Sequence, residues 1–219
     1  MQFPQDIKAV ILDMDGTLLN TEPLHAKAIE TILVQNGLNI TAHEIEERFY
    51  GMSDTEVFKS FENSLFLELD TFLKEKNKLI KNLISQYSYS DFFKLLTPGV
   101  FEFLTEAKKR NIKLALVSAS ENEVIEAILS HLKLKDHFVF YVGRQHTQFT
   151  KPNPSPYFLA LRLLEVKTDE ALIFEDSPSG LKSALGTGAK VVQVTTFSPP
   201  LKSQVSLSID NFSCITFAN

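Results

Sequence analysis

Two pairs of acidic residues follow short apolar runs in this 219-residue chain. Asp13 and Asp15 come after "AVIL", and Glu175 and Asp176 come at the end of "ALIF". Carboxylates that crowd together repel one another, which costs free energy unless a cation neutralises them. Mg²⁺ prefers ligands that are all oxygen atoms. If the fold brings the two pairs together, these residue types predict a Mg²⁺ site made of Asp13, Asp15, Glu175 and Asp176.

The elements expected to position these acids are parallel strands. Short, nearly continuous apolar runs recur along the chain with helical patterns between them, and they end at Asp13, Ser118, Gly143, Glu175 and Thr195. Strands that are apolar on both faces are typical of a parallel sheet covered by helices, so we predict an α/β fold with a Rossmann-like parallel sheet. The ends of such strands meet at one edge, where open α/β folds bind ligands.

The interval of residues 21–96 departs from this alternation. Its apolar residues recur at helical spacing in "EPLHAKAIETILVQNG", "TAHEIEERFYG", "SDTEVFKSFENS" and a long stretch at residues 65–87, without a strand pattern between them. We therefore predict that residues 21–96 form an inserted α-helical cap domain. The α/β core would then consist of residues 1–20 and 97–219.

The composition narrows the range of partners. A formal net charge of −5 offers no basic footprint for nucleic acid or for an anionic membrane surface. The single cysteine, Cys214, excludes an intramolecular disulfide and a cysteine-based zinc cluster, and it suits a reducing compartment. The first residues lack the basic and then apolar layout of a signal peptide, and no apolar run is long enough to span a bilayer. We expect a cytoplasmic monomer that binds neither nucleic acid nor membrane.

Four motifs in the expected order resemble those of the haloacid dehalogenase superfamily. They are "DMDGT" after the first strand, Ser118 after the second, Lys151 in "TKPNP", and "EDS" after a later strand. The cap position and the segment "NTEPLH" are similar to the subgroup that contains β-phosphoglucomutase and many sugar-phosphate phosphatases. The resemblance covers essentially the whole chain.

The resemblance implies a phosphoryl-transfer mechanism. Asp13 is the expected nucleophile, which forms an aspartyl-phosphate, and Asp15 is the expected general acid and base. Lys151 and Ser118 are expected to hold the remaining phosphate oxygens. Ser118 also fits a helix cap in "SASENE", and the two roles are compatible.

The resemblance also implies how the metal is held. Mg²⁺ is expected to bind Asp13, the backbone carbonyl of Asp15, Asp176 and a phosphate oxygen, with Glu175 as a further ligand or as the residue that orients a bound water. Gly16 would permit a tight turn and close approach of the backbone. The repulsion between the paired acids is then offset by the metal.

Residues of the helical interval are expected to contact the organic part of the substrate. Lys76 falls in the apolar stripe of its helix, where a lysine must reach outward or meet an anion. The resemblance places Thr21 and His25 near the nucleophile, and it places Lys76 and Gly51 near the substrate. Neutral residues in the loop after the second strand suit sugar hydroxyls, and the substrate contacts expected there are Ala119, Ser120 and Asn122.

Two departures from the subgroup bear on the reaction. In β-phosphoglucomutase an arginine occupies the position of Asp54 and a lysine that of Glu121, and both serve a second phosphate. Acids at these positions repel that phosphate. We therefore expect a Mg²⁺-dependent phosphatase that hydrolyses a small phosphorylated metabolite, a sugar or polyol monophosphate. The alternatives are a β-phosphoglucomutase-type mutase and a non-catalytic protein that binds a phosphorylated metabolite.

Overall fold

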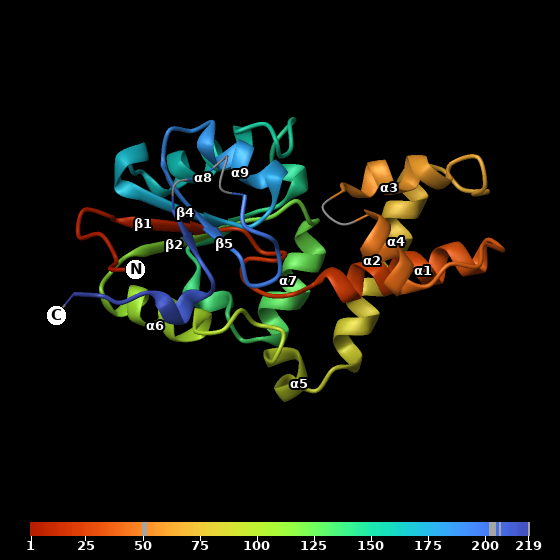
Figure 1. The fold of residues 1–219 in the computed structure, drawn as a ribbon, viewed down its shortest axis with the longest axis horizontal. Helices are drawn as coiled ribbons and strands as arrows, with labels where there is room; N and C mark the ends of the chain where they lie inside the picture. Colours follow the sequence, from red (N-terminus) through yellow and green to blue (C-terminus); the bar gives the residue numbers. More distant parts are fainter. Residues whose placement is uncertain (50–51, 202–204, 206, 219) are drawn as a thin grey trace.

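The computed structural model describes residues 1–49, 52–201, 205 and 207–218. Within these residues the strands form one parallel sheet of six, in the order β3-β2-β1-β4-β5-β6 (Figure 1). Their bounds are β1 Ala9–Leu12, β2 Lys113–Val117, β3 Phe140–Val142, β4 Ala171–Glu175, β5 Lys190–Val194 and β6 Ser208–Ile209. The predicted Rossmann-like parallel sheet is confirmed.

Helices cover both faces of the sheet, as the apolar strands predict (Figure 1). Val10 and Leu12 of β1 pack into a core with α6 (Val100–Lys109) and α7 (Asn122–His131). Their neighbours Ala9 and Ile11 point to the opposite face and pack against α8 (Ser155–Leu164) and α9 (Pro178–Leu185). Because successive side chains of a strand alternate between faces, β1 contributes to both cores and is fully buried.

Most of the remaining helices lie beyond the carboxyl-terminal edge of the sheet, and the last of them lies beside α7 (Figure 1). We call them the cap helices: α1 Glu22–Gln35, α2 Ala42–Phe49, α3 Asp54–Phe61, α4 Leu69–Gln86 and α5 Tyr89–Phe93. Most have an apolar core of their own, built around residues such as Ile29, Ile32, Val57 and Phe72. No helix in the described part of the chain has both the length and the apolar content needed to cross a membrane.

Two adjacent connections join the cap helices to the sheet. Leu19 forms an antiparallel bridge with Leu96. The N–H of Asn20 donates to the carbonyl of Leu95 at 2.8 Å, and the N–H of Thr97 donates to that of Leu18 at 3.0 Å. The outgoing and returning segments are therefore paired with each other, close to the end of β1.

Some elements differ from the sequence-based expectations. The long cap helix begins at Leu69 and not near residue 65. The short helix α5, the helix α6 and the two-residue strand β6 were not predicted, although Val100, Phe103, Leu104 and Ala107 of α6 recur at helical spacing. A strand of two residues is too short to show periodicity, and its place in the sheet is set by pairing with β5.

Candidate active site

The candidate site lies where the strands end. Asp13 follows β1 and Ser118 follows β2, while Glu175 is the last residue of β4 and Asp176 comes next. The N–H of Asp13 donates to the carbonyl of Phe174 at 3.0 Å, which continues the ladder between β1 and β4 past the end of β1. The sheet therefore fixes these side chains along one edge, as the parallel strand pattern predicts.

Asp13, Glu175 and Asp176 form a buried acidic cluster. One carboxylate oxygen from each lies within 4.8 Å of the others, and each residue is at most 6% exposed. Burial and the charge of Glu175 raise the pKa of Asp13 well above its ordinary value. The same two causes raise the pKa of Asp176 to about 8. Clustered carboxylates whose charges are costly are a donor set that suits a divalent, oxygen-preferring cation.

Lys151 is the cation that the chain itself supplies to this cluster. Its Nζ contacts the carboxylate of Asp13, lies 2.6 Å from Oε1 of Glu175, and donates to the carbonyl of Val117 at 3.1 Å. Burial alone would lower the pKa of Lys151, but the charges of Asp13 and Glu175 raise it above its ordinary value. Lys151 is therefore a fixed positive charge beside Asp13.

Glu175 is held from every side. Its Oε1 accepts from the hydroxyl of Tyr157 at 2.7 Å as well as from Lys151, and its Oε2 accepts from the N–H of Asp176 at 3.0 Å. The backbone of α9 passes so close that a Cβ on Gly180 would lie 1.8 Å from Oε1. Glu175 therefore orients Lys151. Sequence reasoning missed Tyr157 and Gly180, although a glycine in the first turn of a helix after "EDSPS" is a signal of close approach.

Asp15 has a separate environment made of hydroxyls and a histidine. Its Oδ2 accepts from Ser118 at 3.0 Å and from Ser120 at 3.1 Å, while Oδ1 accepts from Thr21 and lies 3.5 Å from Nε2 of His25. Burial alone would raise the pKa of Asp15. The hydrogen bonds and the charge of His25 outweigh it and hold the pKa below its ordinary value. The surroundings therefore raise the pKa of Asp13 and lower that of Asp15.

The turn between these two acids and the cap is built on Gly16 and Thr17. Gly16 has φ of +90°, and a Cβ there would lie 2.3 Å from Oδ2 of Asp176. Thr17 donates its hydroxyl to Oδ1 of Asp176 at 3.1 Å. The first and last motifs are therefore in direct contact, which only a residue without a side chain at position 16 permits.

Lys76 connects the cap helices to Asp15. It is 1% exposed, and its ammonium pairs with the carboxylate of Asp54 and lies 3.1 Å from Nδ1 of His25. Burial alone would raise the pKa of Asp54, and the charge of Lys76 holds it below its ordinary value. The lysine that the sequence places in an apolar stripe meets an anion, and that anion is one of the two acids that depart from the mutase pattern.

A cavity of about 540 Å³ opens between the sheet edge and the cap helices. Six of the predicted site residues line it: Asp13, Asp15, His25, Ala119, Ser120 and Lys151. Five others contact or flank these residues without lining the cavity: Gly16, Thr21, Ser118, Glu175 and Asp176. Lys76 lines a small adjoining cavity together with Ala119 and Ser120.

Two predicted substrate contacts stand apart. Asn122 begins α7, and its Nδ2 lies 3.1 Å from Nε2 of His146, so it lines a second cavity between α4 and α7 and not this one. The structure thus places Asn122 away from the main cavity, and its contact with the substrate stays a prediction. Gly51 lies outside the described residues. Arg144 and Glu22 line the main cavity but were not predicted, although Arg144 follows the end of β3 at the same sheet edge.

The chain is similar to known proteins both in sequence and in fold. Residues 10–194 match the family model described as haloacid dehalogenase-like hydrolase. The chain is 31% identical over 185 residues to the phosphorylated carbohydrates phosphatase of Thermotoga maritima, covering 83% of this chain and 82% of that protein.

Among solved structures, a β-phosphoglucomutase from Clostridium difficile is 25% identical to this chain and superposes with a TM-score of 0.77, covering 94% of this chain and 92% of the other. CbbY of Rhodobacter sphaeroides, solved with xylulose-(1,5)bisphosphate, superposes with a TM-score of 0.84 at 24% identity, covering 96% and 97% of the two chains. The chain therefore belongs to the haloacid dehalogenase-like hydrolase family, and it is an enzyme.

Proposed function

We propose that this protein is a Mg²⁺-dependent phosphatase that hydrolyses a sugar or polyol monophosphate through an aspartyl-phosphate. The observation that carries this proposal is that Asp13 and Asp15 line the same cavity in different surroundings. Asp13 faces Lys151 and the acidic cluster, whereas Asp15 faces hydroxyls and His25. Two neighbouring carboxylates in different environments are suited to two different roles.

In the first step an oxygen of Asp13 attacks phosphorus, and the bond from phosphorus to the alcohol oxygen breaks. Asp15 gives its proton to that departing oxygen. In the second step Asp15 takes a proton from water, and the water oxygen attacks the phosphorus of the aspartyl-phosphate. Inorganic phosphate leaves, Asp13 recovers its carboxylate and Asp15 its proton.

Asp15 must hold a proton in the first step, yet its pKa in the free protein is lowered. A substrate phosphate bound beside Asp15 brings a like charge, which favours the protonated carboxyl. His25, 3.5 Å away, lies between Asp15 and the ammonium of Lys76 and is placed to exchange that proton. Substrate binding therefore prepares the acid that the reaction needs.

Asp13, Asp176 and the backbone at Asp15 would hold the metal, whose role when bound is to neutralise charge between an anionic nucleophile and an anionic substrate. The raised pKa of Asp13 supports a cation requirement, because the free carboxylate is costly in this cluster. Lys151 supplies a second fixed charge toward the phosphate oxygens. Both oxygens of Glu175 are already hydrogen-bonded, so we propose that the role of Glu175 is to orient Lys151.

The ion pair between Lys76 and Asp54 favours hydrolysis over a mutase reaction. A mutase must hold a bisphosphate, whose second phosphate needs free cations. Here Lys76 is already paired with Asp54, and Arg144 lies 3.7 Å from Glu121. The similar proteins include both a phosphatase and a mutase, and this local difference supports the phosphatase.

The test is phosphate release from hexose, pentose and polyol monophosphates with Mg²⁺ and with a chelator. Glucose 6-phosphate formation from β-glucose 1-phosphate is followed in parallel. We expect Mg²⁺-dependent phosphate release that is absent in Asp13→Asn, with thermal unfolding used to show that the variant folds. Formation of glucose 6-phosphate without net phosphate release would establish the mutase instead, and binding without turnover would establish a non-catalytic protein.

A further inference from the structure

The cap side of the main cavity combines an apolar part with acidic residues. Glu22, Ala26 and Ile29 follow one another at helical spacing on α1 and face the cavity together. Other apolar residues from α2, α3 and the chain between them complete this wall: Ile45, Phe49, Met52 and Val57. The apolar part of this wall can accept the carbon surface of a ligand.

The charges around this wall are mostly negative. Among the described residues that line the main and the adjoining cavity, away from the catalytic acids and Lys151, there are two cations and five acids. The acids are Glu22, Glu46, Asp54, Glu56 and Glu121. Both cations have acidic partners, since Lys76 pairs with Asp54 and Arg144 lies near Glu121. An anion entering this part of the cavity would meet no unpaired cation on these residues.

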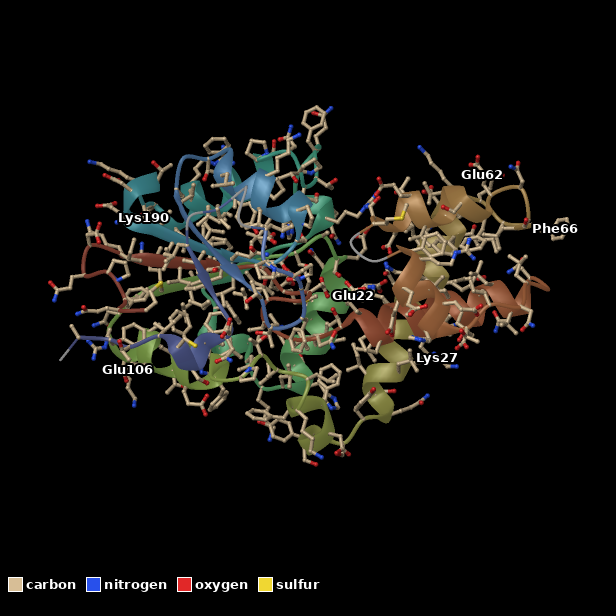
Figure 2. The ribbon with its side chains drawn as sticks, viewed as in Figure 1. Glu22, Lys27, Glu62, Phe66, Glu106 and Lys190 are labelled. Atoms are coloured by element: carbon tan, nitrogen blue, oxygen red, sulfur yellow. The ribbon has the colours of Figure 1, made fainter. Side chains whose placement is uncertain are left out.

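Glu22 is the acid best placed to contact a ligand. It stands in the first turn of α1, where the chain passes from the sheet into the cap helices (Figure 2). Within the described residues no hydrogen bond or ion pair reaches its carboxylate, and it lines the same cavity as Asp13 and Asp15. Burial and then the charge of Asp15 raise its pKa, partly opposed by His25. A ligand that donates hydrogen bonds would supply the partners that Glu22 lacks.

We infer that the alcohol part of the substrate carries no anion, presents carbon surface to the cap wall, and donates a hydrogen bond to Glu22. This inference rests on the proposed phosphatase function and narrows its substrate class. The donor is a hydroxyl or an ammonium group, whereas a second phosphate or a carboxylate is excluded by like charge in a partly closed cavity. Phosphorylated hydroxy acids and bisphosphates are therefore poor substrates.

Matched substrate pairs test the inference. Sorbitol 6-phosphate and 6-phosphogluconate differ at the far end by a hydroxymethyl against a carboxylate, and phosphoethanolamine and phosphoglycolate differ by an ammonium against a carboxylate. We expect kcat/KM to be at least about tenfold higher for the member without the carboxylate in each pair. The two pairs also distinguish a hydroxyl from an ammonium as the donor to Glu22. Equal or higher values for the carboxylate members overturn the inference while leaving the phosphatase intact.

Substitutions test whether Glu22 and Glu121 cause the preference for substrates without a carboxylate. Glu22→Gln removes one negative charge from the wall and is expected to raise kcat/KM for 6-phosphogluconate relative to sorbitol 6-phosphate. Glu121→Gln frees Arg144 from its acidic neighbour and is expected to act in the same direction. The matched control is Glu62→Gln, which changes the net charge equally at an exposed position far from the cavity (Figure 2). An identical shift in the control would overturn the assignment to Glu22 and Glu121.

A binding measurement separates this inference from the reaction itself. The Asp13→Asn variant lacks the nucleophile, so calorimetry can compare its affinities for the two members of each pair without turnover. We expect tighter binding of sorbitol 6-phosphate than of 6-phosphogluconate, and Glu22→Gln in the same background should narrow the difference. If the wild type releases no phosphate from any compound, the phosphatase proposal fails, and the binding preference still supports or overturns the charge selection.

Discussion

The carboxylate of Glu175 occupies the space next to Gly180 so closely that a Cβ on the glycine would lie 1.8 Å from Oε1. Glu175 in turn holds Lys151 at 2.6 Å, and Lys151 contacts Asp13. The first turn of α9 thus sets the position of Lys151, the cationic neighbour of Asp13, through a single fully buried carboxylate. Gly180 is a positioning residue, although it lies outside the cavity.

We therefore predict that Gly180→Ala lowers kcat/KM at least about a hundredfold, because it displaces Glu175 and with it Lys151. The overpacking should also cost about 1–3 kcal/mol of unfolding free energy. Gly186→Ala at the other end of α9 is the control, since its Cβ would lie 3.1 Å from Cβ of Pro154 and needs only a small shift. Steady-state kinetics and denaturant unfolding compare the two variants. Equal kinetics for both would show that Glu175 does not position Lys151.

Asp15→Asn should separate the two steps of the reaction. The first step needs a proton on the leaving oxygen only when the leaving group is a poor one, whereas the second step needs a base for every substrate. With p-nitrophenyl phosphate we expect a burst of one equivalent of p-nitrophenolate followed by turnover slowed about 10²–10⁴-fold. With an alkyl phosphate we expect no burst. Rapid-quench measurements check this, and Asp13→Asn should show no burst with either substrate. A burst of product from the alkyl phosphate would argue against Asp15 as the acid.

Metal binding should release protons. With the pKa of Asp176 raised to about 8, this carboxyl holds a proton at neutral pH in the metal-free protein and must lose it to bind a cation. Affinity for Mg²⁺ should therefore rise with pH between about pH 6 and 8, by up to about tenfold per unit for each proton released. Calorimetry in buffers of different ionisation enthalpy counts the protons, and Asp176→Asn should release fewer. Affinity that is constant from pH 6 to 8 would contradict this prediction.

The same raised pKa has a consequence for stability. An unfolded aspartate ionises near pH 4, whereas folded Asp176 keeps its proton up to about pH 8, so the folded state binds more protons between these values. Stability of the metal-free protein should fall as pH rises through this window, and Mg²⁺ should restore it. Thermal unfolding measured across this pH range, with chelator and with Mg²⁺, shows whether stability falls or rises with pH. In the presence of chelator, the stability of Asp176→Asn should depend less on pH.

Loss of Asp54 and loss of Lys76 from their ion pair should have unequal effects on stability. The side chain of Lys76 is 2% exposed and that of Asp54 is 32% exposed, so a lone lysine is more costly than a lone aspartate. We predict that Asp54→Asn lowers the unfolding free energy by about 3 kcal/mol, that Lys76→Met lowers it by less, and that the double variant is more stable than Asp54→Asn alone. Urea unfolding of the four proteins measures the cycle. Additive effects would show that the pair is not coupled.

Strand ends were the most predictable part of the molecule. A parallel strand buried on both faces reads as a continuous apolar run, so the positions of Asp13, Ser118 and Glu175 at one edge could be predicted from pattern alone. Lys76 was predictable in the same way, because a charge in an apolar stripe requires a partner. Which partner it meets was not, since Asp54 lies on a different helix and is placed by the packing of α3 on α4.

The residues that sequence reasoning missed act through backbone proximity or tertiary packing. Tyr157 and Gly180 do not belong to any of the four sequence motifs. They matter because both lie against Glu175 in the folded protein. The position of Asn122 also depends on the tertiary structure. It comes two residues after Ser120, but it is the first residue of α7 and lines a different cavity. Neighbours in sequence need not face the same cavity.

The paired connections at Leu19 and Leu96 allow the segment between them to change during evolution. Because the chain leaves and returns at positions hydrogen-bonded to each other, the whole interval between them can lengthen, shorten or be exchanged without altering the spacing of Asp13, Ser118, Lys151 and Asp176. Natural selection can therefore revise most of this interval while the sheet-edge residues keep their places, provided that Thr21 and His25 keep their contacts with Asp15.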